Sequence, residues 1–101
     1  MPGFQLSTEA ESELDEIWLY IARASGSVDI ASRAVDNITD RFWLLALHPY
    51  LGRRRDHDLS AGLRSLSVDE YVIIHRVEAD GLILILHIMH GSRDISSFFA
   101  G

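Results

Sequence analysis

With 101 residues, 48% of them hydrophobic, the chain is long enough for one folded core and too short for two, so we expect a single domain over residues 1–101. The sequence contains no cysteine, which excludes disulfide bonds and thiolate metal sites. The formal net charge is −6 and all nine basic residues are arginine, so no diffuse basic field is available for general nucleic-acid binding.

The N-terminal part of the chain predicts a short strand followed by an amphipathic helix. Residues 3–6 alternate apolar side chains with other residues, which is typical of a short strand. Ser7 and Thr8 then offer capping oxygens, and Thr8 with Glu11 has capping-box spacing. Apolar residues follow at helical spacing, and these are Leu14, Ile17, Trp18 and Ile21. Residues 25–27, Ser-Gly-Ser, end this helix and can cap the next one.

A second helix is predicted over residues 28–47 by a stripe of apolar side chains. The stripe recurs at alternating steps of four and three residues, and its members are Ala31, Val35, Ile38, Phe42 and Leu45. His48-Pro49 ends the helix, because the residue before a proline is disfavoured in helical geometry. Two consecutive helices joined by a short Gly/Ser segment are typical of an antiparallel hairpin.

The second half of the chain predicts strands, after a loop over residues 49–61 that contains three consecutive arginines. Residues 63–68 alternate, residues 71–77 are rich in β-branched side chains, and residues 82–89 are nearly all apolar. Ala79-Asp80-Gly81 is a tight hairpin signal between the last two strands. Strands that are apolar on both faces lie inside a sheet, so we expect these two to be central.

These elements predict an α+β fold with an N-terminal strand and an antiparallel helical hairpin packed on one face of an antiparallel sheet. The hairpin covers one face because both helices have an apolar stripe to bury. We expect the opposite face, with the tail over residues 90–101 and the arginine loop, to be open to a partner.

The sequence also bounds location and chemistry. Acidic residues crowd positions 9–16, where a secretory signal would need a basic start and an apolar run. The apolar run over residues 82–86 is too short to cross a bilayer, so we expect a cytoplasmic protein without a membrane partner. No phosphate loop, nucleophile elbow or cofactor fingerprint is present, so we expect no cofactor and no small-molecule substrate.

Several segments, taken in order along the chain, carry a resemblance to a known family. These segments are Leu14–Trp18, His48-Pro49, Gly62–Ser65, Tyr71–Val77 and Ile83–Ile95. They resemble the corresponding segments of ParE toxins, which belong to the RelE/ParE superfamily of type II toxin–antitoxin systems. The resemblance spans nearly the whole chain and implies a RelE/ParE-like fold.

The resemblance implies a toxin that inhibits DNA gyrase when free and is neutralised by direct binding of a cognate ParD-like antitoxin in a hetero-oligomer. Such a toxin acts by binding and is not an enzyme. The alternative is a RelE-like ribosome-dependent mRNA endonuclease, because the two groups share a fold and residues must decide between them. A third hypothesis is a binding scaffold that kept the fold and lost the activity.

Ribonuclease chemistry at a 2′-hydroxyl needs a base, an acid and cations that stabilise the phosphorane. The candidates for these roles are Arg64, Glu70, His90, Arg93 and Asp94. By resemblance, Arg93 lies where RelE toxins carry a C-terminal arginine. The strand arginine of RelE toxins falls near Ser67 here, and their C-terminal tyrosine falls near Phe98 or Phe99, which have no hydroxyl. These losses and the net acidity favour a toxin without catalytic residues.

Partner contacts are predicted among the arginines and the aromatic tail. A loop with three arginines suits contact with an acidic antitoxin tail, with gyrase or with its DNA, and the alternative is local ion pairing with Asp56 and Asp58. Arg64 and Arg93 are candidates to converge on one anion, and exposed aromatics such as Trp43 often anchor partners. The predicted contact residues are Arg53, Arg54, Arg55, Arg64, His90, Arg93, Phe98 and Phe99.

Other polar groups are assigned structural roles. His87 and His90 with Asp94 do not predict a metal site, because this spacing on a strand directs the two rings to opposite faces. We expect His75 to be a part-buried residue whose ring is satisfied by backbone or water. The acidic residues 9–16 are predicted to form a solvated helix face.

Overall fold

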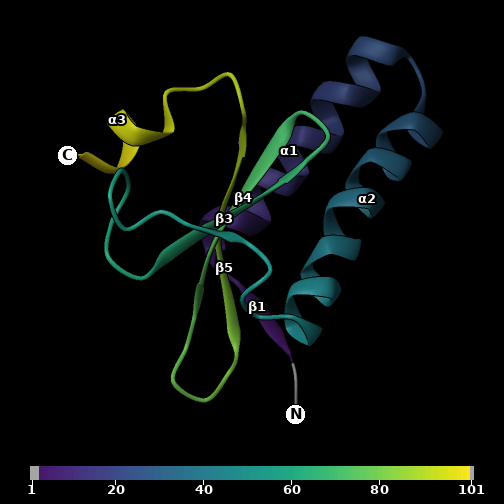
Figure 1. Cartoon of the computed structure of the whole chain (residues 1–101). Helices are drawn as coiled ribbons and strands as arrows, with labels where there is room; N and C mark the ends of the chain where they lie inside the picture. The colour runs from purple at the N-terminus through teal and green to yellow at the C-terminus, as the bar shows by residue number, and fades with distance from the viewer. Residues whose placement is uncertain (1–2, 101) are drawn as a thin grey trace.

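The computed structural model of the chain describes residues 3–100, in which a helical hairpin packs against a five-stranded sheet (Figure 1). In chain order the elements are β1 (Phe4–Leu6), α1 (Thr8–Ser25), α2 (Val28–Leu47), β2 (Arg53–Arg54), β3 (Leu63–Val68), β4 (Tyr71–Val77), β5 (Ile83–His90) and α3 (Ile95–Ala100). The predicted α+β architecture is confirmed. Among the described helices, none combines the length and the hydropathy needed to span a membrane.

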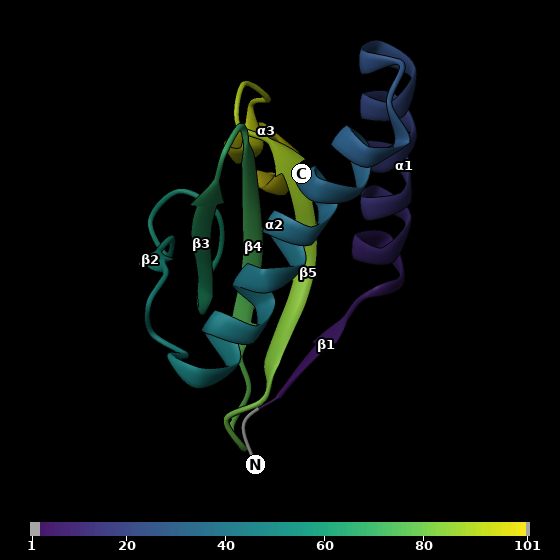
Figure 2. The same ribbon diagram turned by 90° about the vertical axis from the view of Figure 1, so that its right-hand side faces the viewer.

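The sheet has the strand order β1-β5-β4-β3-β2, so the two most apolar strands are central as predicted (Figure 2). Each strand from β2 to β5 pairs antiparallel with the next one along the chain. In contrast, β1 pairs parallel to β5, with Phe4 opposite Ile83. No hairpin connects the first strand to the last, so nothing in the local sequence sets their relative direction. The sheet is therefore mixed, with one parallel edge strand.

The N-terminus of α1 is capped by Ser7. The Ser7 hydroxyl accepts the Ala10 N–H at 3.0 Å and donates to the Leu86 carbonyl at 2.7 Å. The predicted capping box of Thr8 and Glu11 is wrong, because Thr8 is already the first residue of the helix. One side chain thus caps α1 and joins it to β5.

The main core lies between the hairpin and the sheet. Its fully buried members from α2 and the central strands are Ile38, Phe42, Leu45, Ile73, Ile83 and Ile85. The predicted stripe of α2 therefore faces the sheet, and His48 ends the helix as expected. Trp18 of α1 is only half-buried, which differs from the core position expected for it, and its indole N–H donates to the Ser32 hydroxyl at 3.2 Å.

The opposite face of the sheet is also covered, which corrects the expectation of an open face. The loop before β3 and the C-terminal α3 close over it, and their cluster consists of Leu59, Leu63, Ile74, Met89 and Ile95. Figure 1 shows α3 on the side of the sheet away from α2. Because β4 and β5 are apolar on both faces, both faces need a cover, and the tail supplies the second one.

The arginine loop also differs from its prediction. Arg53 and Arg54 form the edge strand β2, which pairs with Ser65 and Arg64 of β3. A strand of two residues has no period of its own, so its pattern could not be recognised in the sequence. The pairing fixes the backbone that carries these two arginines.

His75 lies at the centre of β4 and is fully buried, not part-buried as predicted. Neither ring nitrogen has a hydrogen-bond partner of good geometry. The backbone of Gly52 packs on the ring so closely that a Cβ at Gly52 would lie 2.6 Å from the His75 Cε1 atom. The pKa of His75 is lowered from 6.5 to about 4, chiefly because burial disfavours the charged ring, while the Ile73 backbone partly opposes this shift and the nearby Arg64 charge adds to it.

We predict that His75 makes stability fall with acidification between about pH 6.5 and pH 4. The folded pKa lies below the unfolded one, so the unfolded chain binds the extra proton in this window and the free energy of unfolding rises with pH. The full contribution is about 3 kcal/mol. Urea denaturation at several pH values across this range gives the free energy of unfolding as a function of pH. This free energy should rise less steeply with pH in His75→Leu than in the exposed-site control His57→Leu. Equal slopes in both variants would contradict the assignment.

Candidate functional site

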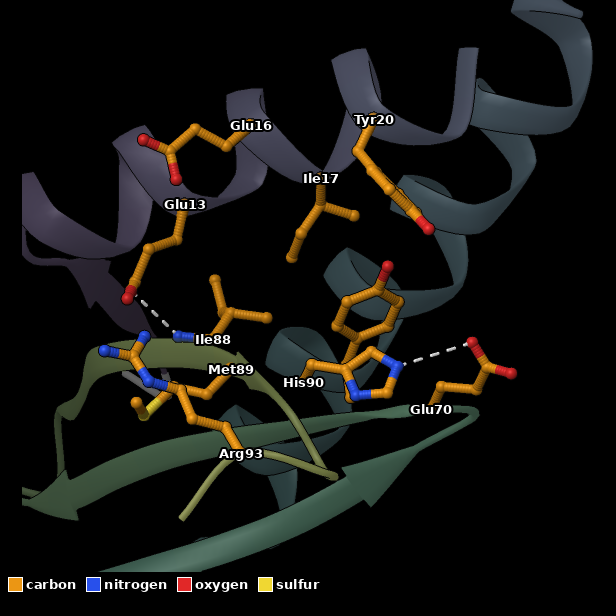
Figure 3. Close-up of a pocket in the computed structure, with 10 residues that line it drawn as sticks. Glu13, Glu16, Ile17, Tyr20, Glu70, Ile88, Met89, His90 and Arg93 are labelled. Carbon is orange, nitrogen blue, oxygen red and sulfur yellow. Dashed lines mark hydrogen bonds and ion pairs between the residues drawn. The ribbon is translucent and has the colours of Figure 1, made fainter. Parts of the chain in front are cut away.

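His90 and Arg93, two of the predicted contact residues, lie in one hollow of about 350 Å³ (Figure 3). The hollow is bounded by α1 on one side and by the end of the sheet on the other, where β3 turns into β4 and β5 ends. Its apolar walls include Ile17, Tyr20 and Met89. We call it the acidic hollow.

Carboxylates outnumber cations in the acidic hollow. Glu13, Glu16 and Glu70 line it, whereas Arg93 is its only arginine. The His90 ring lies 3.6 Å from the Glu70 carboxylate through Nε2. A phosphate placed here would meet more negative than positive charge, so the hollow is poorly suited to an anionic ligand.

Glu13 holds the outer edge of β5. Its carboxylate accepts the Ile88 N–H at 3.0 Å and lies 3.2 Å from His87 Nδ1. The prediction that all acidic residues of α1 are solvated is wrong for Glu13, whose side chain is only 19% exposed. The signal that could have found it is its position four residues before Ile17, on the buried side of the helix.

The aromatic tail packs on the same region from the other face. Phe98 and Phe99 stand edge-on to the His87 ring, with centroids 5.0 Å and 5.6 Å away. The Arg93 guanidinium lies 4.9 Å from the Phe98 ring centroid, within range of a cation–π contact. Phe98 stays exposed whereas Phe99 is partly buried in the second cluster, so only Phe98 offers a free aromatic surface.

The consecutive arginines divide into two kinds. Arg53 and Arg54 are exposed, and Arg54 keeps 74% of its side chain exposed while pairing with Asp56 at 2.8 Å. Arg55 is only 11% exposed, because it binds the Asp58 carboxylate and the Ser65 hydroxyl. The Arg55 hydrogen bond lowers the pKa of Asp58. Arg55 therefore holds the loop together. Local ion pairs engage two of the three consecutive arginines, Arg54 and Arg55.

Arg64 is also held by the fold. Its Nη2 donates to the carbonyls of Tyr50 and Gly52 at 3.0 Å and 2.6 Å, and the guanidinium lies 5.3 Å from the Tyr50 ring centroid. Arg64 lies in a separate hollow of about 220 Å³ with Tyr50 and Arg54. It does not converge with Arg93, so the expected shared anion site is not formed.

The C-terminal end of α2 and the loop after it expose apolar side chains. Trp43, Leu47, Tyr50 and Leu51 each leave about half or more of their surface exposed, with Tyr50 at 71%. Tyr50 also lines the hollow that contains Arg54 and Arg64, so the two features are continuous. We call Tyr50, Leu51, Arg53 and Arg54 the arginine edge.

The two histidines and the aspartate near the end of β5 each contact a different partner. His87 contacts Glu13, His90 contacts the Ser92 hydroxyl at 2.6 Å, and Asp94 accepts from Ser97 at 2.6 Å. Across residues 3–100 we find no group of three or more histidine, aspartate or glutamate side chains placed to hold a metal ion. The residues described thus provide no cluster to which a metal role could be assigned.

Comparisons with known proteins agree on one family. The family model described as "ParE toxin of type II toxin-antitoxin system, parDE" matches residues 4–95. The chain is 31% identical to toxin ParE3 of Caulobacter vibrioides over 84% of this chain and 82% of that protein. It is 28% identical to toxin ParE1 of Mycobacterium tuberculosis over 91% of this chain and 92% of that protein.

Two solved structures share the fold. One is the chromosomal ParDE system from P. aeruginosa, with a TM-score of 0.76, 24% identity, and coverage of 89% of this chain and 96% of that chain. The other is the toxin–antitoxin complex RelBE2 from Mycobacterium tuberculosis, with a TM-score of 0.62, 19% identity, and coverage of 89% and 99%. At these identities the structural likeness shows the fold alone.

We predict that Glu13→Ala destabilises the fold by about 1–3 kcal/mol, because the Ile88 N–H loses its acceptor in a part-buried site. The matched control is Asp15→Ala, an exposed acid on the same helix, which should change stability by less than about 0.5 kcal/mol. Urea denaturation at neutral pH measures both. Equal stability of the two variants would show that Glu13 does not hold the edge of β5.

Proposed function

This chain belongs to the ParE toxin family of type II toxin–antitoxin systems, and we propose that it inhibits DNA gyrase when free and is neutralised by direct binding of a ParD-like antitoxin. It acts as one cytoplasmic domain through surface contacts with two macromolecules. No proton transfer or cofactor enters this function.

The observation that carries the proposal is the arginine edge. Arg53 and Arg54 project from a strand whose backbone is held by β3, and the exposed Tyr50 lines the same hollow as Arg54. Arginine and aromatic residues dominate the binding energy of protein interfaces, and the arginine fork also binds phosphate oxygens. A surface of this kind suits contact with DNA gyrase, an enzyme that is itself bound to DNA.

The remaining predicted residues take different parts in the proposal. Arg55 and Arg64 position the edge, because their guanidinium groups are bound to the protein itself. His90, Arg93 and Phe98 face the acidic hollow or its border, and we assign them to the antitoxin. The two related structures are a toxin–antitoxin system and a toxin–antitoxin complex, which supports a partner of this type.

One observation favours the ribonuclease as a second candidate function. His90, Glu70 and Arg93 lie in one hollow, so a possible base, acid and cation are close together. Against it, Glu13 and Glu16 add negative charge where a phosphorane would need cations. Arg64, the other arginine proposed for this chemistry, lies in a different hollow.

We predict that induced expression halts growth with filamentation and a DNA damage response, and that the purified chain inhibits supercoiling by gyrase. The double variant Arg53→Glu/Arg54→Glu should weaken inhibition at least about tenfold, as expected for interface hot spots. The matched control is Arg33→Glu/Arg41→Glu, which reverses two exposed arginines of α2.

Three outcomes would overturn the proposal. Cleavage of translated messages that is lost in Arg93→Ala, with gyrase unaffected, would establish the ribonuclease instead. Equal inhibition by the two double variants would remove the arginine edge from the target interface. Absence of any growth effect would leave a scaffold without toxic activity.

A further inference from the structure

The small hollow at the outer edge of the sheet is bordered by two arginines from neighbouring strands. Its volume is about 220 Å³, and Arg54 of β2 and Arg64 of β3 both line it. The two residues lie directly opposite each other in the antiparallel pairing of β2 with β3, so their side chains leave the sheet on the same face. Figure 2 shows these two strands side by side at the sheet edge. We call this cavity the arginine hollow.

The arginine hollow carries an excess of positive charge. Asp56 is the only acidic residue among those that line it. Its carboxylate lies 2.8 Å from Arg54 Nε and accepts the Gly62 N–H at 2.8 Å. The hydrogen bond from Gly62 and the contact with Arg54 lower the pKa of Asp56, which therefore stays ionised at neutral pH. Two arginines and one aspartate leave one positive charge that is not offset.

The charge that is not offset belongs to Arg64. Among residues 3–100, no carboxylate lies within ion-pair distance of its guanidinium group. Its Nη2 donates to the Tyr50 and Gly52 carbonyls, which fixes the side chain without neutralising it. Its Nε is buried and has no hydrogen-bond partner within the same range of residues. A part-buried guanidinium without a counter-charge is costly, and a bound anion would remove that cost.

Both arginines keep donors that the protein itself does not use. Asp56 engages Arg54 through Nε, and the two carbonyls engage Arg64 through Nη2. Within residues 3–100, no hydrogen bond is formed by either Nη of Arg54 or by Nη1 of Arg64. The planar fork of a guanidinium group matches the oxygens of a phosphate. Each side chain is thus held by one nitrogen and can present others to a ligand.

The size of the arginine hollow restricts what it can take. Pockets for drug-sized molecules hold about 300–1,000 Å³, so a cavity of about 220 Å³ suits one small anionic group better than a whole nucleotide. Arg54 keeps 74% of its side chain exposed, so it can reach a group on the surface of a macromolecule. A single phosphate of a nucleic-acid backbone has the charge, the size and the accessibility that these features require.

We propose that the arginine hollow binds one phosphate group, and that this group is a backbone phosphate of the DNA held by gyrase. The inference rests on the proposed function and names the chemistry of its target step. Arg53 lies on the other face of β2, opposite Ser65, and stays available for the gyrase protein. One phosphate contact is too weak for general DNA binding by an acidic chain, so DNA is recognised only where gyrase presents it.

The first test titrates the purified chain with dimethyl phosphate, a phosphodiester, and with inorganic phosphate at constant ionic strength. The NMR signals of the Arg54 and Arg64 Nε–H groups should shift in a saturable way. Arg54→Gln should weaken this binding at least about tenfold, because one charged donor pair is lost. Arg53→Gln should respond as the parent does, because Arg53 faces away from the hollow. Circular dichroism checks that each variant is folded.

The second test measures binding of the same variants to gyrase, with and without a bound DNA duplex. Arg54→Gln should weaken binding to the gyrase–DNA complex at least about tenfold and leave binding to gyrase alone unchanged. Arg33→Gln is the matched control, since it removes an exposed arginine of α2 and should bind both forms as the parent does.

The outcomes separate this inference from the function on which it rests. Equal phosphate binding by Arg54→Gln and Arg53→Gln would overturn the hollow as a phosphate site. Equal weakening of Arg54→Gln with and without DNA would assign the hollow to a carboxylate of gyrase, and phosphate binding without any effect on the gyrase–DNA complex would assign it to free phosphate. Either result overturns DNA as the source. No binding of gyrase by the parent chain would overturn the proposed function, while the titration would still decide whether the hollow binds phosphate.

Discussion

The structure depends on β5 being enclosed on every side. This strand pairs with β1 and β4, packs under the helical hairpin through Ile85, and is covered on its other face by the cluster around Met89. Where β1 ends, Ser7 and Glu13 of the α1 region take over the outer edge of the strand. The position of α1 relative to the sheet, and with it the shape of the acidic hollow, follows from these contacts.

The charges of the chain are sorted onto different surfaces. Acidic side chains line the acidic hollow, whereas the exposed side chains of Arg53 and Arg54 lie on β2 at the far edge of the sheet. The net charge of −6 obscures this arrangement, because it averages over both surfaces. Two surfaces of opposite sign suit the two different partners proposed for this chain.

The periodic parts of the fold could be predicted from the sequence, and the isolated contacts could not. The bounds 28–47 and 71–77 agree with the structure because a stripe or an alternation repeats along them. β2 and α3 are too short to show a period, and the direction of β1 depends on a strand far along the chain.

The candidate site was predicted in part. Residue type indicated which side chains could bind a partner. In the fold, however, Arg55 donates a hydrogen bond to the Ser65 hydroxyl and Arg64 donates one to the carbonyl of Gly52. Those acceptors lie ten or more residues away in the sequence, so only the fold brings them close. The acidic hollow itself is formed by α1, the end of β5 and the turn between β3 and β4, which no local pattern connects.

Hydrogen–deuterium exchange of the purified chain, free and bound to each partner, tests most directly whether the two surfaces are separate. We predict that the antitoxin slows exchange in residues 16–24 and 69–71 and leaves residues 50–54 unchanged, whereas gyrase protects residues 43–54. Protection of residues 50–54 by the antitoxin, with no change around the acidic hollow, would contradict the account.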